Sequence, residues 1–228
     1  MHLNNELIFL KYAKPYFQSG QKIIEIGPQG NPTAYQKLVD NPAVEWHSLD
    51  IIEGYAGENN HNFIFTKDPY NYPIADNTYD LVFSGGVMCN VGEIWTWMQE
   101  LKRIVKPGGL IITITPISWP YANAPVDCWR IYPDGFKALN NFLGLETIHC
   151  SKESLELQHF GFTDQLAKTE NLVVPYVSAA GYSEKSRNMT SVNKHKMLVN
   201  RLLKSIPLVR RYMNPVHTAL DTISVAKK

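Results

Sequence analysis

The chain has few cysteines and almost no net charge. Its 228 residues include three cysteines, Cys89, Cys128 and Cys150, and none of them forms a C-x-x-C pair. With one cysteine left over from any pairing, this usage suits a reducing compartment. The formal net charge is +1 and the sequence pI is about 7.7, so no overall basic field indicates a nucleic-acid partner.

Long apolar runs and low-complexity tracts are also missing. No run approaches the about 20 apolar residues that cross a bilayer, and the first residues lack a basic region followed by an apolar core and a cleavage site. We therefore expect a cytoplasmic protein without membrane contact. The 44% hydrophobic and 19% charged residues are enough to bury a substantial core, which predicts a single domain over residues 1–228.

Residues 22–32, KIIEIGPQGNP, organise the first half of the chain. The short apolar run over 22–26 predicts a parallel strand covered on both faces. Gly27 lets the backbone turn tightly and approach a ligand, and Pro32 suits the first position of a helix over 32–39. Together they predict a cradle for a nucleotide-containing cofactor, although an ordinary strand-to-helix turn is the alternative. The dinucleotide fingerprint G-x-G-x-x-G is not met, because Gln29 replaces its second glycine.

Two acidic residues follow at the ends of predicted strands. Residues 44–49 predict a second strand, and Asp50 at its end lies about 20 residues beyond the glycine turn, where an acid can accept from a cofactor ribose. A helix cap or a solvated loop residue is the alternative for Asp50, and Glu53 is the backup candidate. Residues 62–66 predict a third strand, after which Asp68 can accept from an adenine amino group.

Three motifs then coincide in order. Glu25 and Gly27 match E-x-G-x-G-x-G, while Gln29 and Asn31 replace its later glycines. Residues 72–82, YPIADNTYDLV, match L-P-F-x-D-x-S-F-D-L-V, and residues 100–110, ELKRIVKPGGL, match E-L-x-R-V-L-K-P-G-G. With these three motifs, the chain resembles the class I S-adenosylmethionine (SAM) dependent methyltransferases that act on small molecules. The resemblance covers about residues 22–116.

The resemblance implies a fold, a cofactor and a set of site residues. The fold class is α/β, with a doubly wound, mostly parallel, Rossmann-like sheet, an antiparallel last strand and a helical insertion before it. The cofactor is SAM. The expected cofactor-binding residues are Glu25, Gly27, Pro28, Gln29, Gly30, Asp50, Ile51, Asp68, Pro69, Tyr70, Ser84 and Gly85. Of these, Tyr70 offers its backbone N–H to an adenine ring nitrogen, since Pro69 has none to donate.

The hydrophobic pattern, together with what the resemblance implies about the last strand, divides the chain into four parts. Residues 1–20 hold a helix over 5–17, residues 21–150 form the cofactor-binding core, residues 151–217 form a helical insertion or lid, and residues 218–228 form the closing strand. Within the core we expect a fourth strand ending at Ser84, a helix over 91–105, strands over 110–115 and 145–150, and a helix over 133–144. Residues 194–212 predict a basic amphipathic helix, which either covers the substrate site, as we favour, or lies on a membrane or a partner.

Residues 117–133 are the expected acceptor region. Their aromatic side chains beside fixed charges suit a polar ring-bearing ligand such as a sugar, and PVDCWRIYP over 125–133 resembles P-V-D-x-W-R-F-T-P of methyltransferases in glycan and secondary-metabolite pathways. An Asp127–Arg130 ion pair that locks the loop is the alternative. The expected substrate-binding residues are Trp119, Tyr121, Asp127, Trp129 and Arg130. Asp127 is the first candidate for a general base, and His149 and His159 are the runners-up.

The sequence therefore predicts an enzyme that transfers the methyl group of SAM to a hydroxyl or amine of a small molecule, a sugar or secondary metabolite, by in-line displacement. A hydroxyl acceptor requires a general base, whereas an amine needs only to arrive neutral. No metal-ligand constellation stands out, so we predict no metal site. A non-catalytic partner protein with the same fold and a nicotinamide-dependent oxidoreductase are the alternatives, and a homodimer is one assembly that the sequence allows.

Overall fold

The computed structural model describes residues 2–53, 61–119, 121, 126–155 and 219–228. Leu3–Glu153 and Leu220–Lys228 form one compact unit, which contains all the elements below. Its strands are β1 (Lys22–Ile26), β2 (Glu45–Asp50), β3 (Phe63–Phe65), β4 (Tyr79–Gly85), β5 (Val105–Ser118), β6 (Glu146–Glu153) and β7 (Leu220–Lys227). Its helices are α1 (Leu3–Ile8), η1 (Phe9–Ala13), η2 (Lys14–Tyr16), α2 (Ala34–Val39), η4 (Met88–Asn90), α3 (Ile94–Ile104) and α4 (Pro133–Phe142).

The seven strands form one sheet in the order β3-β2-β1-β4-β5-β7-β6. The first five strands in this order are parallel, and β7 runs antiparallel to both β5 and β6. Strand order reverses between β1 and β4, and ligands of open α/β sheets bind at the carboxyl ends of the strands beside such a switch point. The structure thus confirms the doubly wound, mostly parallel sheet with an antiparallel last strand.

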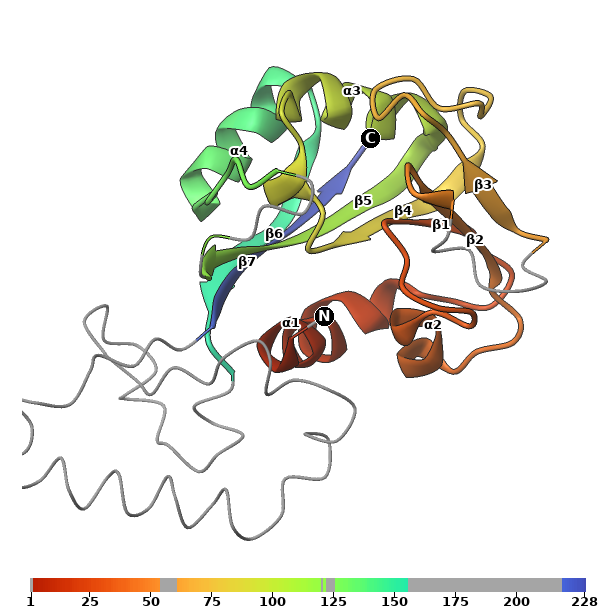
Figure 1. Cartoon of the computed structure of the whole chain (residues 1–228), viewed down its shortest axis with the longest axis horizontal. Helices are drawn as coiled ribbons and strands as arrows, with labels where there is room; N and C mark the ends of the chain where they lie inside the picture. Colours follow the sequence, from red (N-terminus) through yellow and green to blue (C-terminus); the bar gives the residue numbers. More distant parts are fainter. Residues whose placement is uncertain (1, 54–60, 120, 122–125, 156–218) are drawn as a thin grey trace, which may run out of the picture. The chain divides into compact units, whose positions relative to one another are not determined.

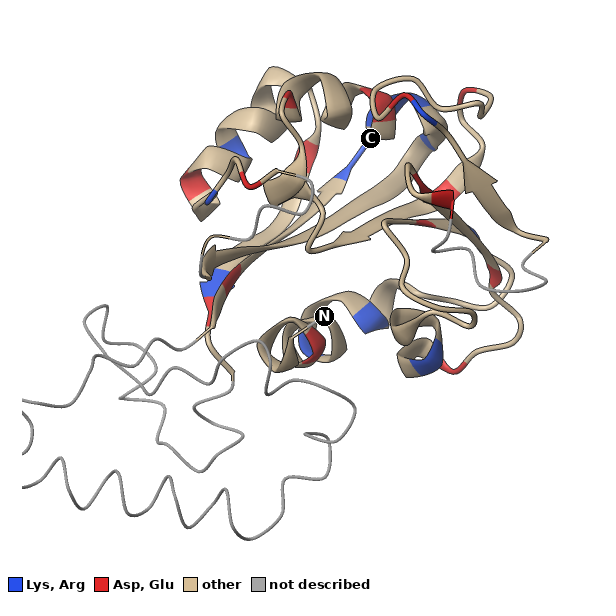
Figure 2. Cartoon of the chain, in the orientation of Figure 1, with Lys and Arg blue, Asp and Glu red and all other residues tan. Residues whose placement is uncertain are grey.

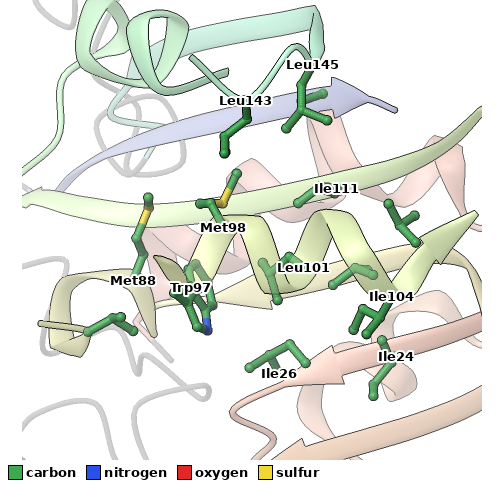
Figure 3. Packing of buried hydrophobic residues seen from close by; sticks show 14 of the residues in the cluster. Ile24, Ile26, Met88, Trp97, Met98, Leu101, Ile104, Ile111, Leu143 and Leu145 are labelled. Atoms are coloured by element: carbon green, nitrogen blue, oxygen red, sulfur yellow. The ribbon is translucent and has the colours of Figure 1, made fainter. Parts of the chain in front are cut away.

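Helices cover both faces of the sheet (Figure 1), with α3 and α4 on one face and α1 and α2 on the other. On the first face, Trp97, Leu101 and Ile104 of α3 pack against Ile24 and Ile26 of β1 (Figure 3). Because α3 places apolar residues three and four positions apart, one stripe of the helix meets the sheet.

The second face is packed by aromatic rings. Phe9 of η1 lies 4.8 Å from Tyr35 of α2 and 5.1 Å from Phe83 of β4 between ring centroids, and Tyr35 lies 4.6 Å from Phe83. Such tilted and edge-on pairs stabilise beyond their buried area. They hold η1 and α2 against β4 near its carboxyl end, which is followed by a glycine turn.

Several element boundaries differ from the expected ones. Helix α2 begins at Ala34 with Thr33 as its N-cap, so the expectation that Pro32 starts this helix is wrong. Strand β5 begins at Val105 instead of residue 110, because Val105 pairs with Tyr79 of β4. Strand β6 continues to Glu153, beyond the predicted strand end at residue 150.

Most of the predicted insertion over 151–217, including the amphipathic helix over 194–212 and His159, lies outside the described residues. Among the helices that the structure describes, none combines the length and apolar character of a membrane span. Lys and Arg are interspersed with Asp and Glu over the described elements (Figure 2).

Candidate cofactor and acceptor site

The glycine turn after β1 begins with one more hydrogen bond to β2 and then leaves the sheet. Gly27 donates its N–H to the Leu49 carbonyl of β2 at 2.9 Å and has φ of 75°. A Cβ at Gly27 would lie 2.2 Å from Cγ2 of Val87, so the turn has no room for a side chain. Gly30 also has positive φ, and Gln29 and Gly30 are exposed while Pro28 is buried. Both glycines of the turn therefore have a backbone conformation that favours glycine.

Glu25 lies beneath this turn and not on its surface. It is 1% exposed, and its Oε2 accepts hydrogen bonds from Thr33 Oγ1 at 2.5 Å and from Trp46 Nε1 at 3.2 Å. Since Thr33 also caps α2 through a capping box with Gln36, Glu25 ties the strand to the helix start across the turn. Burial raises the pKa of Glu25 to about 7, although both hydrogen bonds lower it.

Asp50 stands at the end of β2, as the sequence predicts. Its carboxylate is half-buried, and Oδ1 accepts from the Ile52 N–H at 2.8 Å. Burial raises the pKa of Asp50, although the Ile52 and Ile51 amides act in the opposite direction. Ile51 and Ile52 are 40% and 43% exposed, which is unusual for isoleucine. A carboxylate and two apolar side chains therefore share one strand end.

Asp68 follows β3 on the neighbouring strand end. Asp50 is the register partner of Phe65, so the loop from Thr66 leaves the sheet beside Asp50. Burial raises the pKa of Tyr72, the hydrogen bond from Trp97 lowers it, and the charges of Glu100, Asp50 and Asp68 raise it further. The structure thus brings Asp50 and Asp68 to one edge of the sheet.

The Tyr70 N–H donates to Asp68 Oδ1 at 2.8 Å in this structure. Its expected bond to an adenine ring nitrogen would replace this contact and stays a prediction. The Tyr70 hydroxyl accepts from the Glu93 N–H at 3.1 Å. Pro69 between the two residues is partly buried.

Ser84 and Gly85 end β4 close to the glycine turn. Ser84 is 1% exposed, so its side chain lies within the packed sheet. A Cβ at Gly85 would lie 2.2 Å from the Tyr35 hydroxyl oxygen, which shows that α2 packs directly against this glycine. The next residue, Gly86, has φ of 83° and donates its N–H to the Ile114 carbonyl at 2.8 Å.

The loop after β5 contains the ion pair that the sequence offered as an alternative. Arg130 Nη1 and Nη2 lie 2.5 and 2.6 Å from Asp127 Oδ1 and Oδ2. The same nitrogens donate to the carbonyls of Trp129 and Trp119. Because Asp127 is 3% exposed and both of its oxygens face Arg130, this geometry favours a loop clasp over a general base or an open substrate contact.

Trp129 and its neighbours dock this loop onto η4 and the start of α3. The N–H groups of Cys128 and Trp129 donate to the Cys89 carbonyl at 2.7 and 3.3 Å. Trp129 Nε1 donates to the Val91 carbonyl at 2.7 Å, and its ring meets Trp95 edge-on at 6.1 Å. Of the expected acceptor residues, Trp119 is partly buried and Tyr121 is 76% exposed.

The histidine candidates are not at this place. His149 lies on β6, and β7, β5 and β4 separate β6 from β1, which is about 19 Å at about 4.8 Å per strand step. Its ring stacks on Tyr12 at 4.7 Å, and Nε2 lies 2.8 Å from Ser151 Oγ. His149 therefore lies four strands away from the glycine turn, at the end of the sheet, and its role as a general base stays a prediction.

The described part of the chain contains one buried thiol beside the site. Cys89 is buried, and burial raises the pKa of its thiol to about 11. Within the same residues, no group of three or more histidine, cysteine or acidic side chains is arranged to hold a metal ion.

The polar stripe of α3 is a feature that the sequence analysis missed. Glu100 is 6% exposed and accepts from the Tyr72 N–H at 2.6 Å. Arg103 donates to Glu100 and to the carbonyls of Tyr72 and Ile74. The i, i+3 spacing of an acid and an arginine inside the matched motif was the available signal.

Comparisons with known proteins agree with this arrangement. Residues 36–113 match the protein family described as "Methyltransferase domain". The demethylmenaquinone methyltransferase of Staphylococcus saprophyticus is 34% identical over 88 residues, which cover 39% of this chain and 32% of that protein. The chain spans less than half of the length of the curated relatives that it matches.

Two solved structures share the fold. A SAM dependent methyltransferase from Archaeoglobus fulgidus has a TM-score of 0.57 at 17% identity, with 98% of this chain and 94% of that chain covered. The [4+2]-cyclase SpnF has a TM-score of 0.58 at 13% identity, with 98% and 80% covered. Since one of these two is named for a reaction other than methyl transfer, the fold alone does not fix the activity.

Proposed function

Because this chain has the fold of the class I SAM-dependent methyltransferases and their domain sequence over residues 36–113, we propose that it transfers the methyl group of SAM to a small-molecule acceptor. SAM is the cofactor of this family, and its sulfonium makes the methyl group electrophilic. The protein then has to align donor and acceptor in line and to exclude water.

The observation that carries the proposal is the pair of carboxylates at adjacent strand ends. Asp50 is half-buried at the end of β2, and burial raises its pKa, so its charged form gains from new hydrogen-bond donors such as the two ribose hydroxyls of SAM. Asp68 is exposed beside it and suits the adenine amino group. In this proposal Ile51 covers one side of the adenine, and the turn from Gly27 to Gly30 approaches the remainder of the cofactor.

The acceptor is proposed to bind beyond the carboxyl ends of β4 and β5, next to the docked loop. There the described residues offer alignment more than proton abstraction, since both oxygens of Asp127 are held by Arg130 and the strand of His149 is separated from β5 by β7. An amine that arrives neutral fits this arrangement better than a hydroxyl, which needs a base. The aromatic side chains of Trp119, Tyr121 and Trp129 suit a ring-bearing acceptor.

Calorimetric titration of the purified chain with SAM, S-adenosylhomocysteine and NAD tests the cofactor. We expect binding of the first two and no binding of NAD, because the turn lacks the dinucleotide glycines; the reverse pattern would overturn the assignment. Asp50→Ala should weaken S-adenosylhomocysteine binding by about 10-fold or more, since a hydrogen bond to a charged group contributes about 1.5–3 kcal/mol. Asp134→Ala, which removes an exposed acid of α4, is the control and should bind like the wild type.

Turnover distinguishes an enzyme from a binding protein of the same fold. We expect methyl transfer from labelled SAM to at least one member of a panel of small amines, sugars and phenols. Cofactor binding without turnover on the whole panel would favour the non-catalytic partner protein. Transfer to a sugar hydroxyl with a rate that depends on one ionising group would show that a base outside the described residues takes part.

A further inference from the structure

The loop over residues 66–78 carries Asp68 but contains no described helix or strand, so its shape needs support from elsewhere. That support comes from α3 and the residue before it. The Glu93 N–H donates to the Tyr70 hydroxyl at 3.1 Å, and Trp97 Nε1 donates to the Tyr72 hydroxyl at 2.7 Å. Glu100 accepts from the Tyr72 N–H. The spacing from 93 to 97 to 100 puts these contacts on one face of the helix.

Arg103 lies on the same face of α3, one turn after Glu100, and its guanidinium joins Glu100 to the loop. Its Nε and Nη2 lie 2.7 and 2.6 Å from Glu100 Oε2 and Oε1. Nη2 also donates to the Tyr72 carbonyl at 3.1 Å, and Nη1 donates to the Ile74 carbonyl at 2.7 Å and to Asp76 Oδ1 at 2.6 Å. All five guanidinium N–H donors are therefore engaged, and three of their five acceptors belong to the loop.

The end of α3 joins the loop as well. The carbonyls of Arg103 and Ile104 accept from the N–H groups of Asn77 and Thr78 at 3.0 and 2.8 Å. These carbonyls have no partner within a helix, so the loop satisfies them. Glu93 and α3 thus hold the loop from Tyr70 to Thr78, immediately after Asp68.

We propose that Glu100 and Arg103 are positioning residues for the cofactor, and that they act by fixing the loop that presents Asp68 to the adenine of SAM. This inference rests on the proposed function. It adds that α3, through Glu100 and Arg103, stabilises the loop on which Asp68 lies. Lysine cannot replace Arg103, because its three donors on one nitrogen cannot reach acceptors that surround a planar fork. The acid and the arginine act together, since Glu100 orients the guanidinium and holds Tyr72 directly.

The test is a double-mutant cycle on the full chain, with S-adenosylhomocysteine as the probe in calorimetry. Arg103→Ala and Asp68→Ala should each weaken binding by about 10-fold or more, and Arg103→Lys should behave like Arg103→Ala. If Arg103 acts through Asp68, the double variant should bind about as weakly as Asp68→Ala alone. A double variant weakened by the product of the two single effects would overturn the inference, because a general structural defect adds independently.

A control and a second variant keep the result interpretable. Lys137→Ala removes an exposed i, i+3 ion pair with Asp134 on α4 and should leave binding unchanged. If Arg103→Ala does not fold, Glu100→Gln keeps an acceptor for the Tyr72 N–H and should still weaken binding several-fold; unchanged binding would overturn the inference. A wild-type chain that does not bind the probe would instead refute the proposed function.

Discussion

Glu25 makes the stability of this protein depend on pH in a direction that its surroundings determine. The carboxyl is buried beneath the glycine turn, and burial raises its pKa from 4.5 to about 7. The folded state therefore holds a proton on Glu25 in a pH range where the unfolded chain has lost it. Stability is greatest below the unfolded pKa and falls as the pH rises through the folded pKa.

The size of this effect follows from the two pKa values. Between pH 5 and pH 8 the ionisation of Glu25 should lower the free energy of unfolding by about 2.5 kcal/mol, at about 1.4 kcal/mol per pKa unit. Glu25→Gln removes the ionisation but keeps the shape of the side chain and an oxygen that can accept from Thr33 and Trp46. The variant should therefore gain about this much stability relative to the wild type between pH 5 and pH 8.

Urea unfolding of both proteins at several pH values measures this directly, because the difference between them cancels the other titrating groups. Glu45→Gln is the control: Lys22 lowers the pKa of exposed Glu45, so that residue is charged over the whole range and its difference curve should be flat. A flat curve for Glu25→Gln would refute the reasoning, since it would mean that Glu25 titrates alike in both states.

Three further predictions follow from the site. Asp127→Asn breaks the two-pronged contact with Arg130, so turnover should fall by about 10-fold or more through loss of acceptor alignment, while S-adenosylhomocysteine affinity stays within about twofold of the wild type; unchanged turnover would reject any role for the clasp. Gly85→Ala forces a methyl group against the Tyr35 hydroxyl and should lower the free energy of unfolding by about 1–3 kcal/mol, with partial rescue in a Tyr35→Phe background as the check. A thiol reagent should modify exposed Cys128 rapidly and buried Cys89 only on unfolding, as mass spectrometry of the labelled peptides would show; rapid labelling of Cys89 would contradict its burial.

The sequence predicted the sheet because each strand has a local signature. Residues 22–26 and 110–115 are apolar without alternation, and only a strand covered on both faces buries such a run. The antiparallel last strand was predicted from the family resemblance, and β7 confirms it. The start of α2 was misplaced, because Pro32 and Thr33 are both good helix-start residues and the buried carboxyl of Glu25 selects Thr33 as the cap.

The site was predicted less completely, because the role of a side chain depends on what lies opposite it. Asp50 and Asp68 were placed by their positions after strands, and the parallel register brings them to one edge. Asp127, Glu25 and Glu100 are also acidic residues in suggestive positions, yet Arg130, Thr33 and Tyr72 engage them. The residues around His149 do not indicate that its strand, β6, lies at the edge of the sheet.

The amino-acid sequence by itself determined the order of strands and helices, the glycine turn and the acids that follow the second and third strands, since hydrophobic period and turn chemistry act over a few residues. The tertiary structure alone decided which carboxylates can accept hydrogen bonds from a ligand and which are engaged by other residues of the chain and stabilise loops. Those assignments depend on contacts between residues such as Tyr72 and Glu100, which are distant in the chain and meet only when the helix packs on the sheet.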